Sequence, residues 1–261
     1  MISTKIKCLR LVLLMMLIMI HCHGAWSSYV SIDPSRVKMI SWKPRIFMYE
    51  GFLSQVECNH LISIAKPNLT RSTVTDLATG MSQLSKHRTS HGMFIPRNND
   101  PIVGGIEDKI SAWTFLPKEN GEPIQVLKYE EGEGYKAHYD FFQDNIHIQS
   151  KSGNRIATVL MYLKDVIQGG ETLFPLAHQE HPKTSYNDST ECGKRGLAVK
   201  ARRGDAVVFF GIHVNGSVDG RSMHEACPVI KGQKWSAVKW IQIATSHELH
   251  SLNIYIIGEE G

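Results

Sequence analysis

The sequence predicts an α+β protein in which early helices pack against an antiparallel sandwich or barrel. Two observations support this class: helical patterns precede residue 120, and short β-branched or aromatic runs alternate with turn signals after it. The chain has 261 residues, of which 42% are hydrophobic, so it can bury one substantial core. We expect a targeting segment at 1–25, a helical support region at 26–119, a strand-rich core at 120–243 and a divergent tail at 244–261.

The first 25 residues are typical of a targeting segment. Three basic residues precede the apolar run LVLLMMLIMI at 11–20, and the segment contains no acid. Ten helical residues span about 15 Å of a hydrocarbon core about 30 Å thick. This length favours a signal peptide cleaved after Gly24 or Ala25, with an uncleaved signal anchor as the alternative. Without the three basic charges the net charge of +4 falls to +1, so the charge gives no indication of nucleic-acid binding.

Entry into the secretory pathway changes the interpretation of the cysteines. Cys58, Cys192 and Cys227 follow the targeting segment, and three cysteines in an oxidising lumen suggest one disulfide and one free thiol. We expect an endoplasmic reticulum or Golgi location with the folded domain in the lumen, or a single-pass type II membrane protein if the segment stays uncleaved. Glycosylation sequons begin at Asn68, Asn187 and Asn215.

Two helices are predicted in the support region, after an early strand in PRIFMYE. Ser54 and Glu57 have the spacing of a capping box, and Pro67 ends the first helix. Its buried face is expected to hold Val56, His60, Leu61 and Ile64. Asp100 caps the second helix and Pro101 occupies its first turn. The apolar stripe of this helix comprises Ile102, Ile106, Ile110 and Trp113.

The strands are predicted from a period of two after residue 120. They are separated by turn signals such as KDVIQGG and RRGD, and a long polar loop is expected at 176–195. The predicted strands are PIQVLKYE, YKAHYDFF, RIATVLMYL, LAVKA, DAVVFFG and KWSAVKWIQI.

A candidate metal site begins at His138 and Asp140. Residues i and i+2 of a strand face the same side, so both side chains would point together. The His-x-Asp pattern alone is equally consistent with a solvated strand face, and a third ligand is needed. The downstream candidates are His147, His178, His181, His213 and His224.

The last strand supplies a candidate binding group for an anion. Lys234, Ser236, Val238 and Trp240 share one face of this strand. Because most of these neighbours are apolar, an inward lysine is expected to need an anionic partner, whereas an edge-strand lysine pointing to solvent is the alternative. A jelly roll would bring these distant strands over one cavity.

Together these residues resemble the 2-oxoglutarate- and Fe(II)-dependent prolyl 4-hydroxylases, particularly the short plant type. That family has His-x-Asp, a distant His, and a Lys ten residues later, and this chain has His138-x-Asp140, His224 and Lys234. The resemblance covers roughly residues 40–243. Its blocks here are RTSHGMF, KYEEGEGYKAHYDFF, RIATVLMYLKDVIQGGETLFP, GLAVKARRGDAVVFF and CPVIKGQKWSAVKWI.

The resemblance implies a double-stranded β-helix, or jelly roll, that binds Fe(II) through the two histidines and Asp140. Three coordination positions would stay open for 2-oxoglutarate and O₂. Lys234 and Tyr129 would hold the distal carboxylate of 2-oxoglutarate. Thr172 would support that pocket, or is simply a strand threonine. Oxidative decarboxylation would give succinate, CO₂ and a ferryl species that hydroxylates proline C4, and L-ascorbate would rescue iron oxidised without substrate.

The implied substrate is a proline-rich peptide in the polyproline II form, which aromatic grooves bind well. Similarity places Arg155 among the groove residues as our candidate catalytic residue, although a surface arginine is the alternative. Tyr135 would lie on the strand face opposite His138 unless Gly132 and Gly134 bulge the strand. The substrate-binding candidates are Arg88, Ser90, Glu122, Tyr135 and Trp240. The resemblance also implies that Cys192 and Cys227 form the disulfide, leaving Cys58 free.

Two departures from the family concern the peptide site. Gln242 stands where the family usually has histidine, and His91 stands where serine is usual. Glutamine forms hydrogen bonds but does not titrate near neutrality. Gln242 therefore keeps open a rival hypothesis, a non-catalytic jelly-roll module that binds polyproline. A zinc hydrolase is a second rival, and Lys234 argues against it because zinc hydrolysis needs no anionic cosubstrate. Oligomeric state cannot be assigned from these residues.

Overall fold

The computed structural model describes residues 31–75, 81–97, 100–143, 153–177 and 190–243. The chain divides into two units, Met1–Ile32 and Asp33–Gly261, and every element described here belongs to the second unit. Several predicted features lie outside the described residues: the targeting segment, most of the predicted loop, the whole predicted tail, Asn187, His147, His178 and His181. Within those residues, no helix is both long and apolar enough to cross a membrane.

Sixteen strands and two α-helices make up the described part of the second unit. The helices are α2 (Gln55–Ala65) and α3 (Pro101–Thr114). The strands are β1 (Val37–Trp42), β2 (Arg45–Tyr49), β3 (Thr70–Arg71), β4 (Thr73–Thr75), β5 (Ser82–Leu84), β6 (His91–Phe94), β7 (Gln125–Tyr129), β8 (Tyr135–His138), β9 (Asn154–Tyr162), β10 (Gln168–Gly169), β11 (Thr172–Phe174), β12 (Leu197–Val199), β13 (Ala206–Phe210), β14 (His224–Ala226), β15 (Val229–Lys231) and β16 (Lys234–Ile243).

Antiparallel pairing arranges most of these strands into two sheets. The major sheet has the order β1-β2-β13-β9-β16-β7-β6-β3, and the minor sheet has the order β12-β11-β14-β8. One core cluster joins them, with Leu160 and Val207 from the major sheet and Phe174 and Leu197 from the minor sheet. Two sheets that share their inner faces form a jelly-roll sandwich, so the predicted α+β class with a jelly-roll core is confirmed.

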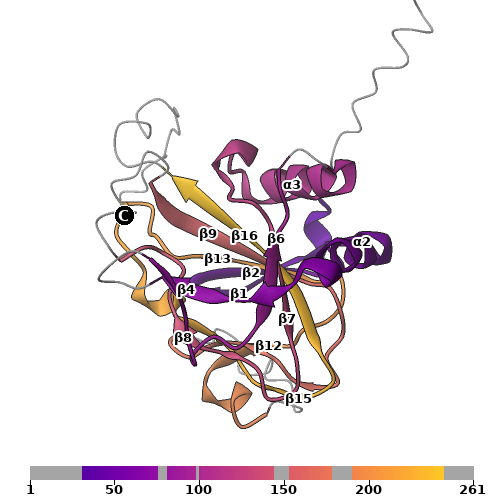
Figure 1. The fold of residues 1–261 in the computed structure, drawn as a ribbon. Helices are drawn as coiled ribbons and strands as arrows, with labels where there is room; N and C mark the ends of the chain where they lie inside the picture. The colour runs from indigo at the N-terminus through magenta and orange to yellow at the C-terminus, as the bar shows by residue number, and fades with distance from the viewer. Residues whose placement is uncertain (1–30, 76–80, 98–99, 144–152, 178–189, 244–261) are drawn as a thin grey trace, which may run out of the picture. The chain divides into compact units, whose positions relative to one another are not determined.

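The two helices cover the outer face of the major sheet, on the side opposite β8, β12 and β15 (Figure 1). The predicted caps are present. Ser54 and Glu57 form the capping box of α2, and the Asp100 carboxylate accepts hydrogen bonds from the backbone N–H groups of Ile102 and Val103 at the start of α3. Each cap satisfies backbone donors that the first helical turn leaves unpaired.

The buried face of α2 differs from the predicted one. Cys58, Leu61 and Ala65 are fully buried, whereas the side chain of Val56 is 69% exposed. The predicted face through Val56 and His60 was compatible with the sequence, because apolar residues lie on several sides of this helix. Packing against the sheet selects the row that starts at Cys58, and this cysteine is the buried free thiol that the sequence predicted.

The support region is less helical than the sequence predicted. Besides the early strand at β2, it contributes β1, β3 and β6 to the major sheet, and β4 pairs with β5 in a separate hairpin. These strands are two to six residues long. Runs this short give little period-two signal, so pairing with the rest of the sheet decides their conformation.

Strand β16 lies at the centre of the major sheet, between β9 and β7, and is buried on both faces. The predicted inward face lines a cavity through Lys234, Ser236, Val238 and Trp240. The alternate residues face the helices, and Lys239 forms a buried ion pair with Glu107 of α3. One strand therefore connects the cavity to the helical layer.

Candidate active site

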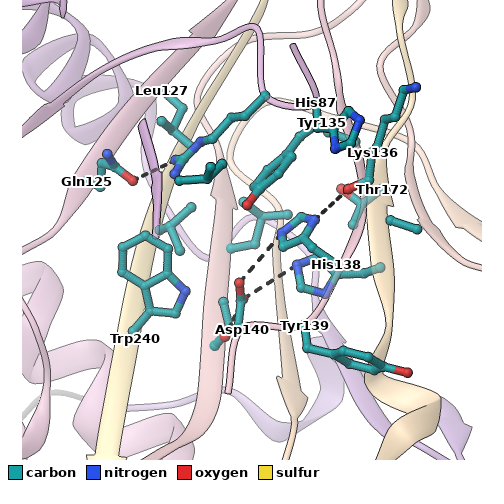
Figure 2. A pocket seen from close by; sticks show the side chains of 18 of the residues that line it. His87, Gln125, Leu127, Tyr135, Lys136, His138, Tyr139, Asp140, Thr172 and Trp240 are labelled. Atoms are coloured by element: carbon teal, nitrogen blue, oxygen red, sulfur yellow. Dashed lines mark hydrogen bonds and ion pairs between the residues drawn. The ribbon is translucent and has the colours of Figure 1, made fainter. Parts of the chain in front are cut away.

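A cavity of about 630 Å³ opens between the two sheets. Its walls come mainly from β7, β9 and β16 of the major sheet, β8 and β14 of the minor sheet, and β11. Figure 2 shows the side chains that converge on it. Most of the residues that the sequence proposed for catalysis, metal binding or substrate binding line this one space.

Three potential metal ligands meet at the cavity wall. His138 Nε2 lies 3.6 Å from Asp140 Oδ1 (Figure 2). His224 Nε2 lies 3.5 Å from Asp140 Oδ2. Their ligand atoms all lie within 4.8 Å of one another, and no other group of three or more His, Cys, Asp or Glu donors in the described residues meets this criterion. Of the five downstream histidines that the sequence left open, His147, His178 and His181 lie outside the described residues, and His224 is the one of the other two that the structure brings to the pair. His224 pairs with His138 across β14 and β8.

The hydrogen bonds of both histidines fix the tautomer that metal binding needs. His138 Nδ1 lies 2.8 Å from the carbonyl oxygen of Lys136, and His224 Nδ1 lies 3.1 Å from that of Ser222. Because a carbonyl oxygen only accepts, each Nδ1 carries the hydrogen, and each Nε2 directs its lone pair toward Asp140. Thr158 donates a 2.7 Å hydrogen bond to Asp140 Oδ2. Two imidazoles and one carboxylate suit Fe(II) with open positions.

Electrostatics keep His138 and Asp140 in the protonation states that bind a metal ion. Burial, reinforced by the neighbouring His224, lowers the pKa of His138 to about 3, so its imidazole is neutral at pH 7. Burial acts to raise the pKa of Asp140, but the adjacent His224 and His138 outweigh it and hold this pKa at about 2. At neutral pH the Asp140 carboxylate is therefore charged and the Nε2 lone pair of His138 is available.

A bulge in β8 resolves the position of Tyr135. Across the β8–β14 pair, His138 faces His224 and Tyr135 faces Ala226, so three steps on β8 oppose two on β14. The extra residue turns Tyr135 to the same side as His138, and their rings stack with centroids 3.6 Å apart. The strand also ends at His138, so the expected single strand through Asp140 is wrong; Asp140 follows the strand end and turns inward.

Lys234 marks the other end of the cavity. Its side chain is 1% exposed, and its Nζ lies 3.5 Å from Thr172 Oγ1, which accepts a 2.8 Å hydrogen bond from Tyr162. Tyr129 is the cross-strand partner of Lys234, and the ammonium lies 5.7 Å from the centre of its ring. Burial lowers the pKa of Lys234 to about 7. Glu171 acts in the opposite direction on this pKa, but no carboxylate among the described residues forms an ion pair with the ammonium, which is therefore suited to an anionic ligand.

A network of charges forms the rim near Trp240. Arg155 donates two hydrogen bonds to Glu122, at 2.6 and 2.7 Å, and its guanidinium lies 4.1 Å from the centre of the Trp240 ring. Gln242 donates a 2.9 Å hydrogen bond to the same carboxylate. Arg155 also reaches the carbonyl oxygen of Asp140 at 3.4 Å, so the rim is linked to the metal-binding segment.

Arg88 and Ser90 occupy different environments. Arg88 lines the cavity, donates to Gln125 Oε1 at 2.9 Å and lies over the Tyr135 ring. Ser90 was expected in the peptide groove, but it is fully buried behind the cavity wall and donates a hydrogen bond to Ser72. Glu122 likewise does not line the cavity; it holds Arg155 from behind. The departure at His91 places an imidazole 3.8 Å from Glu133, in the turn before β8.

Three cavity residues were missing from the sequence prediction of site roles. Thr158 holds Asp140, Gln125 holds Arg88, and Ser236 faces the cavity beside Lys234. Each is a polar residue on the inward face of an otherwise apolar strand, and this is the signal that could have identified them. Which of them would contact a ligand depends on the pairing of strands far apart in sequence.

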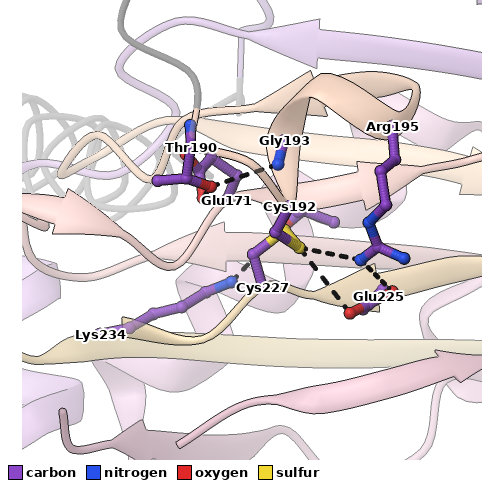
Figure 3. Close-up of a disulfide and its surroundings, with 9 residues drawn as sticks. Glu171, Thr190, Cys192, Gly193, Arg195, Glu225, Cys227 and Lys234 are labelled. Carbon is purple, nitrogen blue, oxygen red and sulfur yellow. Dashed lines mark hydrogen bonds and ion pairs between the residues drawn. A yellow bond between two sulfur atoms is a disulfide. The ribbon is translucent and has the colours of Figure 1, made fainter. Parts of the chain in front are cut away.

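A disulfide joins Cys192 to Cys227, the pair that the resemblance implied (Figure 3). It ties η5 (Gly193–Arg195) to the end of β14, three residues after His224. Arg195 adds a 2.8 Å ion pair with Glu225 of the same strand. Two sequon asparagines, Asn68 and Asn215, are exposed.

Comparison with known proteins agrees with this geometry. A family model described as the 2OG-Fe(II) oxygenase superfamily matches residues 124–242. The chain is thus a 2-oxoglutarate-dependent dioxygenase that uses Fe(II), 2-oxoglutarate and O₂. Probable prolyl 4-hydroxylase 4 of Arabidopsis thaliana is 54% identical over 220 residues, with 83% of this chain and 74% of that protein covered. Prolyl 4-hydroxylase 2 of the same plant is 55% identical over 216 residues, with 81% and 72% covered. The chain belongs to the prolyl 4-hydroxylase family.

Solved structures support the same fold. The viral collagen prolyl hydroxylase of Paramecium bursaria Chlorella virus-1, solved as a 2OG complex, has a TM-score of 0.56 and 25% identity, with 76% of this chain and 95% of that chain covered. A prolyl hydroxylase of Trichoplax adhaerens, in complex with a hypoxia inducible factor peptide fragment, has a TM-score of 0.51 at 14% identity, with 76% and 83% covered. The second likeness supports the fold alone.

Proposed function

We propose that the protein hydroxylates C4 of proline residues in proline-rich secretory peptides and couples this to the oxidative decarboxylation of 2-oxoglutarate. The observation that carries the proposal is one cavity with three parts: a His-Asp-His cluster, a buried lysine and an aromatic rim with an arginine. Each part matches one participant, namely Fe(II), the cosubstrate and the peptide. The names of the plant relatives support the same reaction.

The chain's own residues bind, orient and shield the reactants. His138, Asp140 and His224 would hold Fe(II), and Lys234 with Thr172 would bind the distal carboxylate of 2-oxoglutarate. Bound Fe(II), with 2-oxoglutarate and O₂, supplies the oxidising chemistry at proline C4. The protein contributes the position of the C–H bond and the exclusion of water from the buried lysine end.

The peptide enters over the rim. Tyr135 and Trp240 offer apolar ring faces, and the guanidinium groups of Arg88 and Arg155 are held over these two rings. Polyproline II helices are extended and their backbone carbonyls stay unpaired, so rings for proline and donors for carbonyls fit this ligand. Arg155 is the candidate donor nearest the metal-binding segment, through its contact with Asp140.

The test is succinate release from 2-oxoglutarate with Fe(II), ascorbate and a (Pro)n peptide. The wild-type protein should release succinate that rises with added peptide, and the peptide should gain one oxygen per succinate. His224→Ala should release none above background. A wild-type protein without peptide-stimulated succinate would contradict the enzyme proposal. Without ascorbate, succinate release should stop earlier, because iron that is oxidised without substrate would not be reduced back to Fe(II).

A polyproline-binding module without turnover is the second candidate, because Gln242 replaces the histidine usual in the family. The hydrogen bond from Gln242 to Glu122 helps to hold the carboxylate that orients the Arg155 guanidinium. In this candidate, the peptide binds at the rim without being hydroxylated. Peptide affinity measured by calorimetry, together with an absence of succinate, would favour this candidate. Recovery of turnover in Gln242→His would trace the loss to this residue.

The proposed compartment is the lumen of the endoplasmic reticulum or Golgi. The basic-apolar segment at 1–25, the disulfide and the exposed sequon asparagines Asn68 and Asn215 support it. Mass spectrometry of the mature N-terminus should show cleavage after Gly24 or Ala25; an intact terminus in a membrane fraction would instead indicate a type II anchor. Peptide N-glycosidase should lower the mass of the secreted-pathway form.

A further inference from the structure

Arg88 is a buried cation in the cavity wall that has no carboxylate partner among the described residues. It is 8% exposed and lines the cavity. Its two hydrogen bonds go to uncharged acceptors, the carbonyl oxygen of Thr73 and Gln125 Oε1, and its Nε–H has no acceptor within the described part of the chain. A buried charge that meets only neutral groups keeps much of its desolvation cost. An anion from outside the protein would offset this cost.

The ligands already proposed leave the charge of Arg88 uncompensated. Asp140 is the one carboxylate among the described residues that line the cavity. Together with the two carboxylates of 2-oxoglutarate, it balances the charges of Fe(II) and Lys234. Glu122 balances Arg155 from behind the cavity wall. A cavity loaded with metal and cosubstrate therefore keeps the positive charge of Arg88.

A second cation belongs to the same part of the cavity wall. Lys136 lines the cavity, is exposed, and forms no ion pair within the described ranges. Its backbone N–H donates a 2.9 Å hydrogen bond to the carbonyl oxygen of His87, the residue before Arg88, so the two cations come from adjacent segments on either side of Tyr135 (Figure 2). Cations gathered at a cavity mouth attract anionic ligands.

Stacked rings place Arg88 close to the metal-binding cluster. Its guanidinium carbon lies 5.0 Å from the centre of the Tyr135 ring, and that ring lies 3.6 Å from the centre of the His138 ring. Arg88 is therefore within about 9 Å of the His138 ring, a distance that about three residues of a polyproline II helix cover at about 3.1 Å each. The anionic group of a bound peptide would thus lie near the target proline.

We propose that the protein prefers proline-rich peptides with an aspartate or glutamate within about three residues of the target proline, and that Arg88 and Lys136 bind this carboxylate. The inference rests on the proposed function and narrows its substrate class from proline-rich to acidic and proline-rich peptides. Arg155, whose charge Glu122 already pairs, remains as a donor to backbone carbonyls. Because the preference is electrostatic and arises at the cavity mouth, it should weaken as the salt concentration rises.

The test uses proline-rich peptides of one length that differ at a single position, which holds glutamate, glutamine or lysine. Calorimetry with the Fe(II)- and 2-oxoglutarate-loaded protein without O₂ should give a dissociation constant about tenfold lower for the glutamate peptide than for the glutamine peptide, the magnitude of a hydrogen-bonded charge pair. The lysine peptide should bind more weakly than either. With O₂ present, mass spectrometry should find the hydroxylated proline within about three residues of the glutamate.

Variants of the two cations assign the preference. Arg88→Gln should remove most of it, and Arg88→Lys should keep part of it. Lys136→Glu should reduce it about two- to fivefold, because this lysine is exposed, and it provides the measurement if the variants of the buried arginine fail to fold. Lys86→Glu is the matched control. Lys86 is an exposed lysine two residues before Arg88 that does not line the cavity, and its variant should keep the wild-type ratio.

Two results would overturn the inference. The first is an equal wild-type dissociation constant for the glutamate and glutamine peptides. The second is an unchanged glutamate preference in folded Arg88→Gln or in Lys136→Glu. A failure of the proposed function looks different, because neither peptide would then gain oxygen or stimulate succinate release, whereas the ratio of the two dissociation constants is measured without turnover.

Discussion

At the scale of single residues, the charged groups that line the cavity are of two kinds. Some form an ion pair within the protein, and others have no ion-pair partner among the described residues. The Arg155 guanidinium is bound by Glu122 on two nitrogens, whereas Lys234 meets only a threonine hydroxyl at hydrogen-bond distance in the described residues. A buried charge without a counter-ion gives up its proton more readily, and its ligand affinity then depends on pH.

Binding of 2-oxoglutarate should weaken as pH rises above neutrality. The pKa of Lys234 is about 7 in the ligand-free protein, and the dicarboxylate needs the charged form, so the dissociation constant should increase by up to about tenfold per pH unit above pH 7. The stability of the ligand-free fold changes with pH in the opposite direction. Because the unfolded lysine binds its proton more tightly, the free energy of unfolding from this group rises between pH 7 and about 10.5.

Calorimetry at pH 7 and pH 9 measures this effect, and proton uptake follows from buffers with different heats of ionisation. Lys234→Arg is the control, because arginine stays charged throughout this range. Its affinity should be weaker but nearly independent of pH. Equal wild-type dissociation constants at the two pH values would show that the lysine keeps its charge in the empty cavity.

Gln242 should act on peptide binding through Glu122. Replacing it with leucine removes the 2.9 Å hydrogen bond to the carboxylate that orients Arg155. The KM for a (Pro)n peptide should rise several-fold, while the dissociation constant for 2-oxoglutarate stays unchanged. Gln242→His should make the peptide KM depend on pH near 6.5, where histidine titrates. If the affinity for 2-oxoglutarate fell while the peptide KM rose, the substitution would have disturbed the sheet in general.

At the scale of elements, α3 is attached to the major sheet by the buried Lys239–Glu107 pair. Both side chains are less than one-twentieth exposed. Removal of one partner leaves the other charge buried alone, which costs about 3–5 kcal/mol, whereas replacing both with apolar residues is often nearly neutral. Lys239→Met should therefore lower the free energy of unfolding strongly, and Lys239→Met combined with Glu107→Leu should recover most of it.

Urea unfolding of the two single variants and the double variant forms a double-mutant cycle for this pair. A large favourable coupling between the two positions is expected. A single variant that loses less than about 1 kcal/mol would mean that water reaches the remaining charge. Binding of 2-oxoglutarate should be little changed in the double variant, because Lys239 faces away from the cavity.

The disulfide should matter for the metal site as well as for stability. It closes a separation of 35 residues, and loss of such a link costs about 2–4 kcal/mol. Cys192→Ala with Cys227→Ala should lower the unfolding temperature and also weaken Fe(II) binding, because Cys227 lies three residues from His224 on the same strand segment. Metal titration of the folded double variant separates the two effects. Unchanged Fe(II) affinity would show that β14 is held by its neighbours alone.

The elements show how far the sequence could be interpreted. Capping residues predicted the starts of α2 and α3 because a cap depends on local spacing alone. The inward face of β16 also followed from alternation. The bulge that turns Tyr135 toward His138 could not be fixed from sequence, because it depends on how β8 pairs with β14. The burial of Ser90 behind the cavity wall could not be predicted for a similar reason, because motif position does not show which strand covers a side chain.

At the scale of the whole molecule, the histidines proposed to bind the metal ion and the lysine proposed to bind the distal carboxylate of the cosubstrate lie on different sheets. The histidine ligands lie on β8 and β14 of the minor sheet, whereas Lys234 lies on β16 of the major sheet. A ligand that spans the cavity would therefore bridge both layers. Binding that favours the folded state by mass action adds about 2.7 kcal/mol at a ligand concentration of one hundred times the dissociation constant.

A ligand that bridges the two sheets should protect backbone amides of both sheets from hydrogen exchange. Fe(II) with 2-oxoglutarate should slow hydrogen exchange in β8 and β14 and also in β7 and β16. Fe(II) alone should protect mainly the minor sheet. His224→Ala should lose the metal-dependent part while retaining weak protection by 2-oxoglutarate near Lys234. Protection confined to one sheet under both conditions would contradict the bridge.

The alternation of side chains along β16 should also produce two kinds of substitution effect within one strand. Positions 234, 236, 238 and 240 face the cavity, and positions 235, 237, 239 and 241 are buried on the other side. A systematic substitution scan should therefore give a phenotype that switches with the parity of the residue number. Even positions should change ligand constants as well as stability, because they are buried and also line the cavity, whereas odd positions should change stability and expression at nearly constant ligand constants.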